Sequence, residues 1–95
     1  MNTPHVPVAL FRLGHLVATP NALAHLTQAD ILSAIKRHQA GDWGEVDDHD
    51  RRANDCALNE GTRLFSVYRS ENRIRFWVIT EADRSATTVL LPEDY

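Results

Sequence analysis

The chain contains a single cysteine, Cys56, and this scarcity removes two kinds of covalent or metal stabilisation. One cysteine cannot close an internal disulfide, and without a second cysteine nearby a thiolate zinc site is not expected. We therefore expect Cys56 to be a small, buried apolar side chain of a helix.

Long apolar runs are missing as well. No run approaches the roughly 18 to 20 residues that a membrane-spanning helix needs. The first residues, MNTPHVPVALF, also lack the basic start and the long apolar core of a signal peptide. A cytoplasmic location is therefore expected.

Positive charge is in short supply. The chain has 10 Lys and Arg against 13 Asp and Glu, a formal net charge of -3. Nucleic-acid binding without sequence preference depends on Lys and Arg that neutralise phosphates. The charge balance therefore argues against that class of function.

Motifs for metals and phosphates are absent too. The five histidines form no H-E-x-x-H motif and no pair spaced by four on one helix; they are His5, His15, His25, His38 and His49. The GDWG stretch lacks the Lys and the strand-loop-helix context of a phosphate-binding loop. We expect neither a metal nor a cofactor.

What is present fits one domain of 95 residues, with residues 1–10 expected to be loose. Residues 14–19 read as a strand, and Thr19 followed by Pro20 is typical of a helix start. Thr27 with Asp30 three residues later predicts the start of a second helix, over residues 28–40.

Two glycines predict helix ends. Gly41 closes the helix over residues 28–40, and Gly61 closes a third helix that begins with acidic residues near Asp48. The expected core-facing side of the second helix consists of Ala29, Ile31, Leu32, Ile35 and His38. The expected packing face of the third consists of Ala53, Cys56 and Ala57.

Three segments after Gly61 are rich in β-branched and aromatic residues, namely residues 63–68, 73–80 and 86–91. Short polar links predict that they form an antiparallel meander with the middle segment at its centre. The predicted fold class is α+β, with an N-terminal strand and two to three helices packed on one face of this three-stranded C-terminal meander.

The meander gathers polar side chains that are candidates for chemistry. His38 lies in the last turn of its helix, where the negative end of the helix dipole is expected to raise its pKa and favour the imidazolium. The other candidates for a catalytic set are Arg63, Glu81, Arg84, Thr87 and Thr88. In a hairpin loop, residues such as Glu81, Asp83 and Arg84 most often form a solvated turn with a weak surface ion pair.

The order of elements, with a His at a helix end and an Arg and hydroxyls on the strands, resembles the RelE-type and barnase-type ribonucleases. This resemblance implies metal-independent RNA cleavage. His38 or Glu81 would then be the base or acid, Arg63 or Arg84 the phosphate clamp, and Thr87 or Thr88 an orienting donor. Whether the chain is an enzyme stays open.

The chain also resembles a second family, in the three sequence segments RHQAGDWGEVD, WVITEADRS and TTVLLPEDY. Its members are short proteins of plasmids, integrative elements and phages, labelled plasmid-related or as a type I restriction-modification subunit. A methyltransferase would need a cofactor-binding parallel sheet, for which 95 residues leave no room.

This resemblance implies an accessory or inhibitor protein that binds a protein partner, such as a restriction or CRISPR complex. RNA is a possible partner under the ribonuclease alternative. The expected binding residues are Trp43, Tyr68, Trp77, Asp83, Arg84 and Tyr95, because aromatic residues and Arg dominate interface hot spots. Trp43 and Trp77 are equally candidates for the core. Homodimers are also conceivable if TTVLL is an exposed edge strand.

Overall fold

The computed structural model describes residues 9–95, and the order of its elements confirms the expected α+β fold. The elements are β1 (His15–Ala18), α1 (Pro20–His25), α2 (Gln28–Gln39), α3 (Asp48–Glu60), β2 (Leu64–Arg69), β3 (Arg75–Thr80), β4 (Ala86–Leu90) and the 3-10 helix η1 (Pro92–Asp94). Among the described residues, no helix has the length and apolar character needed to cross a membrane.

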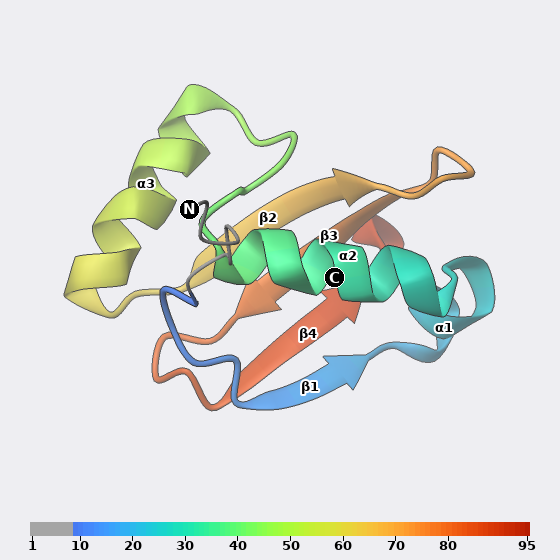
Figure 1. The fold of residues 1–95 in the computed structure, drawn as a ribbon, viewed down its shortest axis with the longest axis horizontal. Helices are drawn as coiled ribbons and strands as arrows, with labels where there is room; N and C mark the ends of the chain where they lie inside the picture. Colours follow the sequence, from blue (N-terminus) through green and yellow to red (C-terminus); the bar gives the residue numbers. More distant parts are fainter. Residues whose placement is uncertain (1–8) are drawn as a thin grey trace, which may run out of the picture.

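The sheet has the strand order β1-β4-β3-β2 (Figure 1). Its C-terminal strands form the expected antiparallel meander, in which Val78 of the middle strand lies opposite both Ser66 and Val89. The sheet differs from the expectation in having a fourth strand, because β1 pairs in parallel with β4 and places Leu16 opposite Thr87. The TTVLL segment is therefore an internal strand and not the exposed edge strand that a dimer through it would need.

The expected helix boundaries are confirmed, together with their caps. The Ala22 N–H donates to Thr19 Oγ1 over 3.1 Å at the start of α1. At the start of α2, Thr27 and Asp30 exchange two hydrogen bonds of 3.0 Å as a capping box. Gly41 and Gly61 follow α2 and α3 with φ of 83° and 70°, a conformation that costs a glycine little.

Helices α1 and α2 pack on one face of the sheet (Figure 1), and most of the core lies between them and the strands. The core residues of this layer are Ala22, Leu26, Ala34, Ile35, Tyr68, Phe76, Val78, Val89 and Leu91. The expected apolar side of α2 is partly wrong. Ala29 and Leu32 are exposed, because the helix turns the small side chain of Ala34 toward the sheet.

Helix α3 lies beside β2 (Figure 1), and its packing face is not the expected one. Ala57 is buried as expected, but Ala53 and Cys56 are exposed. The second buried residue of α3 is Asn54. The expectation of a buried Cys56 is therefore wrong, because α3 turns a polar side chain rather than its thiol toward the strand.

The free edge of β2 is closed by side-chain and loop hydrogen bonds. The Asn54 amide donates to the Phe65 carbonyl over 2.7 Å and accepts from the Phe65 N–H over 3.0 Å. Two residues further along, the Val67 N–H donates to the Trp43 carbonyl and the Val67 carbonyl accepts from the Glu45 N–H. These four bonds satisfy the outward N–H and C=O groups of Phe65 and Val67.

The N-terminal segment that we expected to be loose falls mostly on residues 1–8, outside the described residues, as does His5. Of the remaining two, Leu10 donates its N–H to the Gln39 carbonyl over 2.9 Å. That bond lies at the end of α2, where helix carbonyls lack partners within the helix.

Candidate functional site

A chain of buried polar groups runs from α2 across the sheet face that this helix covers, to the segment before β1. His38 Nδ1 lies 2.6 Å from Ser66 Oγ, and its Nε2 lies 2.9 Å from Thr80 Oγ1. The Thr80 and Thr87 hydroxyls are 2.7 Å apart, and Thr87 donates to the Leu13 carbonyl over 2.7 Å. The four side chains of this polar chain have no exposed surface.

The direction of each hydrogen bond in the polar chain follows from its last acceptor, the Leu13 carbonyl. A carbonyl only accepts, so the hydroxyl proton of Thr87 points at Leu13, and Thr87 must accept from Thr80. The Thr80 hydroxyl then accepts the Nε2–H of His38, which leaves Nδ1 to accept from Ser66. A neutral His38 is therefore the Nε2–H tautomer, and no buried side-chain group of the described residues is left unpaired.

The surroundings of His38 oppose its protonation. Burial, followed by the positive charge of Arg84, lowers the pKa of His38 to about 4. The rings of Phe11 and Trp43 pack edge-on against the imidazole at centroid distances of 5.2 and 5.6 Å. The expected imidazolium is therefore wrong, because desolvation outweighs the attraction of the helix dipole.

Arg84 holds the 81–85 turn to the end of α3. Its φ is 60°, and its guanidinium donates to main-chain carbonyls over 2.6 to 3.2 Å. The acceptors are the carbonyls of Ala57, Thr62, Glu81 and Ala82. These contacts place a cation at the negative end of α3, whose last turn has no basic residue of its own.

The residues expected in the turn thus form a structural link and not an ion-paired cluster. Within the described chain, Arg84 makes no ion pair with Glu81 or Asp83. The Asp83 carboxylate instead accepts from the Ser85 N–H over 3.0 Å, and the Glu81 residue is exposed. Arg84 is half-buried and its guanidinium is already occupied.

The remaining catalytic candidates are divided between the two faces of the sheet. Thr87 belongs to the buried polar chain, whereas Thr88 is half-buried on the opposite face of β4. Arg63 is exposed just before β2. The structure therefore brings Thr87 and Arg84 near His38, but His38 and Thr87 are fully buried. Arg63 and Glu81 are exposed and do not belong to this buried polar chain.

An aromatic cluster occupies the sheet face opposite α2. Trp77 packs edge-to-face with Phe65 at 5.1 Å and with Tyr95 at 5.6 Å between centroids. Arg63 lies 5.3 Å above the Tyr95 ring and donates to its hydroxyl over 2.9 Å. We call Arg63, Phe65, Trp77 and Tyr95 the aromatic cluster.

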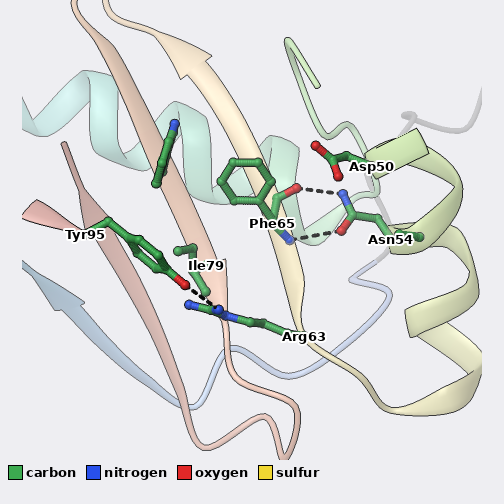
Figure 2. A pocket seen from close by; sticks show the side chains of 8 residues that line it. Asp50, Asn54, Arg63, Phe65, Ile79 and Tyr95 are labelled. Atoms are coloured by element: carbon green, nitrogen blue, oxygen red, sulfur yellow. Dashed lines mark hydrogen bonds between the residues drawn. The ribbon is translucent and has the colours of Figure 1, made fainter. Parts of the chain in front are cut away.

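A cavity of about 340 Å³ lies between this cluster and α3 (Figure 2). Figure 2 shows Tyr95 and Arg63 on one side of it and Asp50 with Asn54 on the other. Its walls are mostly apolar, with one acidic and one basic side chain at the rim. The lining consists of Asp50, Ala53, Asn54, Arg63, Phe65, Trp77, Ile79 and Tyr95.

The expected binding residues have three different locations, of which the 81–85 turn holds Asp83 and Arg84. Trp77 and Tyr95 meet in the aromatic cluster. Trp43 and Tyr68 are core residues, with 3% and 2% exposure, and their polar ends are satisfied by Asp55 and Asp42. The sequence analysis missed Phe65, although the alternation in β2 puts it on the face that carries Trp77.

One group of possible metal ligands lies at the start of α3. The side-chain ligand atoms of Asp47, His49 and Asp50 lie within 4.8 Å of one another. Asp47 is the N-cap of the helix and accepts from the Asp50 N–H over 2.8 Å. Capping accounts for this arrangement, so the absence of a metal site stays a prediction.

No protein-family model matches the chain, and neither the curated proteins nor the solved structures contain a match. Both resemblances noted from the sequence therefore stay predictions. The function has to be argued from the geometry.

Proposed function

We propose that this protein acts by binding a protein partner through the aromatic cluster. In this proposal it is an accessory or inhibitor protein. The resemblance to proteins of mobile elements favours a nucleic-acid-processing defence complex, such as a restriction or CRISPR assembly, as the partner.

The observation that carries the proposal is an ordered set of aromatic rings and an arginine on a sheet face that α1 and α2 leave uncovered. Tyr95 is 71% exposed, whereas Phe65 and Trp77 are half-buried. Aromatic residues and Arg supply most of the binding energy in protein interfaces. Because these rings already hold each other in place, binding costs little side-chain entropy.

The packing of the rings favours a protein over a nucleic acid as the ligand. Stacked bases need free ring faces and a positive surface. Here the three rings pack edge-to-face on one another, with interplanar angles of 83° and 66°, and the chain has a net charge of -3. The ring packing suits an apolar contact with a polar rim, as found in protein interfaces. The negative net charge disfavours binding to phosphates.

The ribonuclease alternative receives less support from the geometry. His38 and Thr87 are fully buried, and Arg84 is bonded to main-chain carbonyls. General acid–base catalysis requires groups within hydrogen-bond reach of the substrate. RNA cleavage is therefore kept as an outcome of the test.

The test compares the wild type with the double variant Arg63→Glu/Tyr95→Ala, which removes the exposed half of the aromatic cluster. A tagged protein expressed in its host is expected to co-purify with one stoichiometric complex. The purified complex should bind the double variant at least about tenfold more weakly. Leu10→Ala is the matched control, because Leu10 is 48% exposed and lies outside the cluster.

Two results would contradict the proposal. One is unchanged affinity of the double variant for the purified complex. The other is cleavage of mixed RNA in EDTA by the wild type that is lost in His38→Ala, since such cleavage would make the protein an enzyme.

A further inference from the structure

The outer edge of β1 is open, in contrast to the closed edge of β2. The His15 and Thr19 N–H groups donate to carbonyls of the β4 side, those of Ser85 and Val89, over 2.9 and 3.0 Å. Main-chain groups alternate in direction along a strand, so those of residues 16 and 18 point away from β4. Leu16 and Ala18 therefore offer N–H and C=O groups at an edge that no other described segment covers (Figure 1).

Apolar side chains surround this edge. Of the six large apolar side chains that are exposed in the described chain, four line one groove beside β1. They are Leu16, Val17, Leu23 and Leu32, with exposures of 49%, 46%, 61% and 50%. The groove has a volume of about 480 Å³ and is bounded by β1, α1 and the start of α2.

Charge is missing from the same region. Residues 13–29 contain no Asp, Glu, Lys or Arg, although the chain as a whole has 23 of them, 10 basic and 13 acidic. Edge strands that must stay unpaired usually carry Lys, Pro or an inward-pointing charge. Of these devices β1 has none, and its neutral surface fits a partner that is equally neutral there.

We propose that the β1 edge binds a second copy of this chain. In this dimer two β1 strands pair antiparallel around a two-fold axis, so that Leu16 lies opposite the partner's Ala18 and the two copies of Val17 meet on the axis. A strand edge is self-complementary under this symmetry. The contact joins two four-stranded sheets into one and brings no charged side chain of residues 13–29 into the interface.

The first test is the mass in solution. Light scattering at tens of micromolar is expected to give twice 10.7 kDa, falling toward 10.7 kDa on dilution, because the paired surface is small. Leu16→Lys should give the monomer at every concentration. Leu10→Lys, with the same change at a 48% exposed leucine outside the groove, should stay dimeric.

The second test traps the proposed register. In an antiparallel pair without hydrogen bonds, Cα atoms lie about 4.5 Å apart, which is within disulfide range. Val17→Cys in a Cys56→Ser background should therefore form a covalent dimer under mild oxidation, and Leu23→Cys in that background should do so less readily. A wild-type monomer at all concentrations overturns the proposal, as does a dimer that survives Leu16→Lys and gives no Val17→Cys cross-link.

The proposed dimer and the proposed partner binding can each be refuted without affecting the other. The groove lies beside β1, whereas the aromatic cluster belongs to β2, β3 and the C-terminus. Leu16→Lys is expected to bind the partner complex, and Arg63→Glu/Tyr95→Ala is expected to dimerise.

Discussion

Mild acid is expected to destabilise the protein through His38. The pKa of His38 is about 4 in the folded chain, against 6.5 for an ordinary histidine. Below pH 6.5 the unfolded chain therefore binds a proton that the folded chain does not, so stability falls as the pH falls toward 4. The difference of 2.5 pKa units corresponds to about 3 kcal/mol, a large part of the roughly 5–15 kcal/mol that stabilises a small domain.

The neighbours of His38 named above do not counteract this loss of stability at low pH. Arg84 is the charged neighbour that adds to the shift, and the rings of Phe11 and Trp43 bring no charge. Hydrogen bonds lower the pKa of Asp42 and Asp94 below 3.8, so the stability that these carboxylates contribute is lost only at more acid pH. The range from pH 6.5 to 4.5 therefore isolates the histidine.

The assay is urea unfolding at pH 7 and pH 4.5. The wild type should lose about 2 kcal/mol between these values, which moves the urea midpoint by roughly 1–2 M. His38→Gln cannot titrate, so its stability should be lower at pH 7 but depend much less on pH. Equal pH dependence in the two proteins, or an NMR titration of His38 centred near 6.5, would refute the reasoning.

Three further predictions concern the contacts that position the two faces of the sheet. Thr87→Val should cost about 1–3 kcal/mol in urea unfolding, because it leaves the Thr80 hydroxyl proton without an acceptor and removes the donor to the Leu13 carbonyl; Thr88→Val on the same strand should change stability by less than about 0.5 kcal/mol. Arg84→Ala should lower the thermal midpoint by several degrees by releasing the carbonyls at the end of α3, and a midpoint equal to that of the wild type would contradict the assigned role. Asn54→Ala should accelerate hydrogen exchange of the Phe65 amide and promote concentration-dependent aggregation through β2, whereas a protected Phe65 amide would show that other groups close that edge.

Local signals in the sequence predicted most of the element boundaries. Helix ends are set by residues next to them, here Thr27 with Asp30 at the start of α2 and the glycines at positions 41 and 61 after α2 and α3. Such effects do not depend on the rest of the fold. The short polar links between the three C-terminal segments likewise predicted that β3 lies between β2 and β4.

Contacts between distant segments could not be predicted in this way. The pairing of β1 with β4 joins residues about seventy positions apart, and the burial of His38 depends on where Ser66 and Thr80 lie in the folded sheet. The helical spacing placed His38 on the core-facing side of its helix but gave no partner for its two nitrogens. Only the register of β2 against β3 places Ser66 and Thr80 where their hydroxyl groups meet the two nitrogens of His38.

The candidate site was predictable in part for the same reason. Trp77 and Tyr95 were expected as binding residues from their chemistry alone. Their proximity depends on η1, where the Asp94 carboxylate accepts from Thr19 and Asn21 and so holds the C-terminus against the start of α1. That long-range contact leaves no trace in the local pattern of residues.

The clamp that Asn54 and the Trp43–Glu45 segment place on β2 has a consequence for assembly. A sheet that is open at both sides can recruit copies without limit and grow into a fibre. Here one side is blocked, so association through β1 must end at a closed pair. Polymerisation would require α3 to detach first.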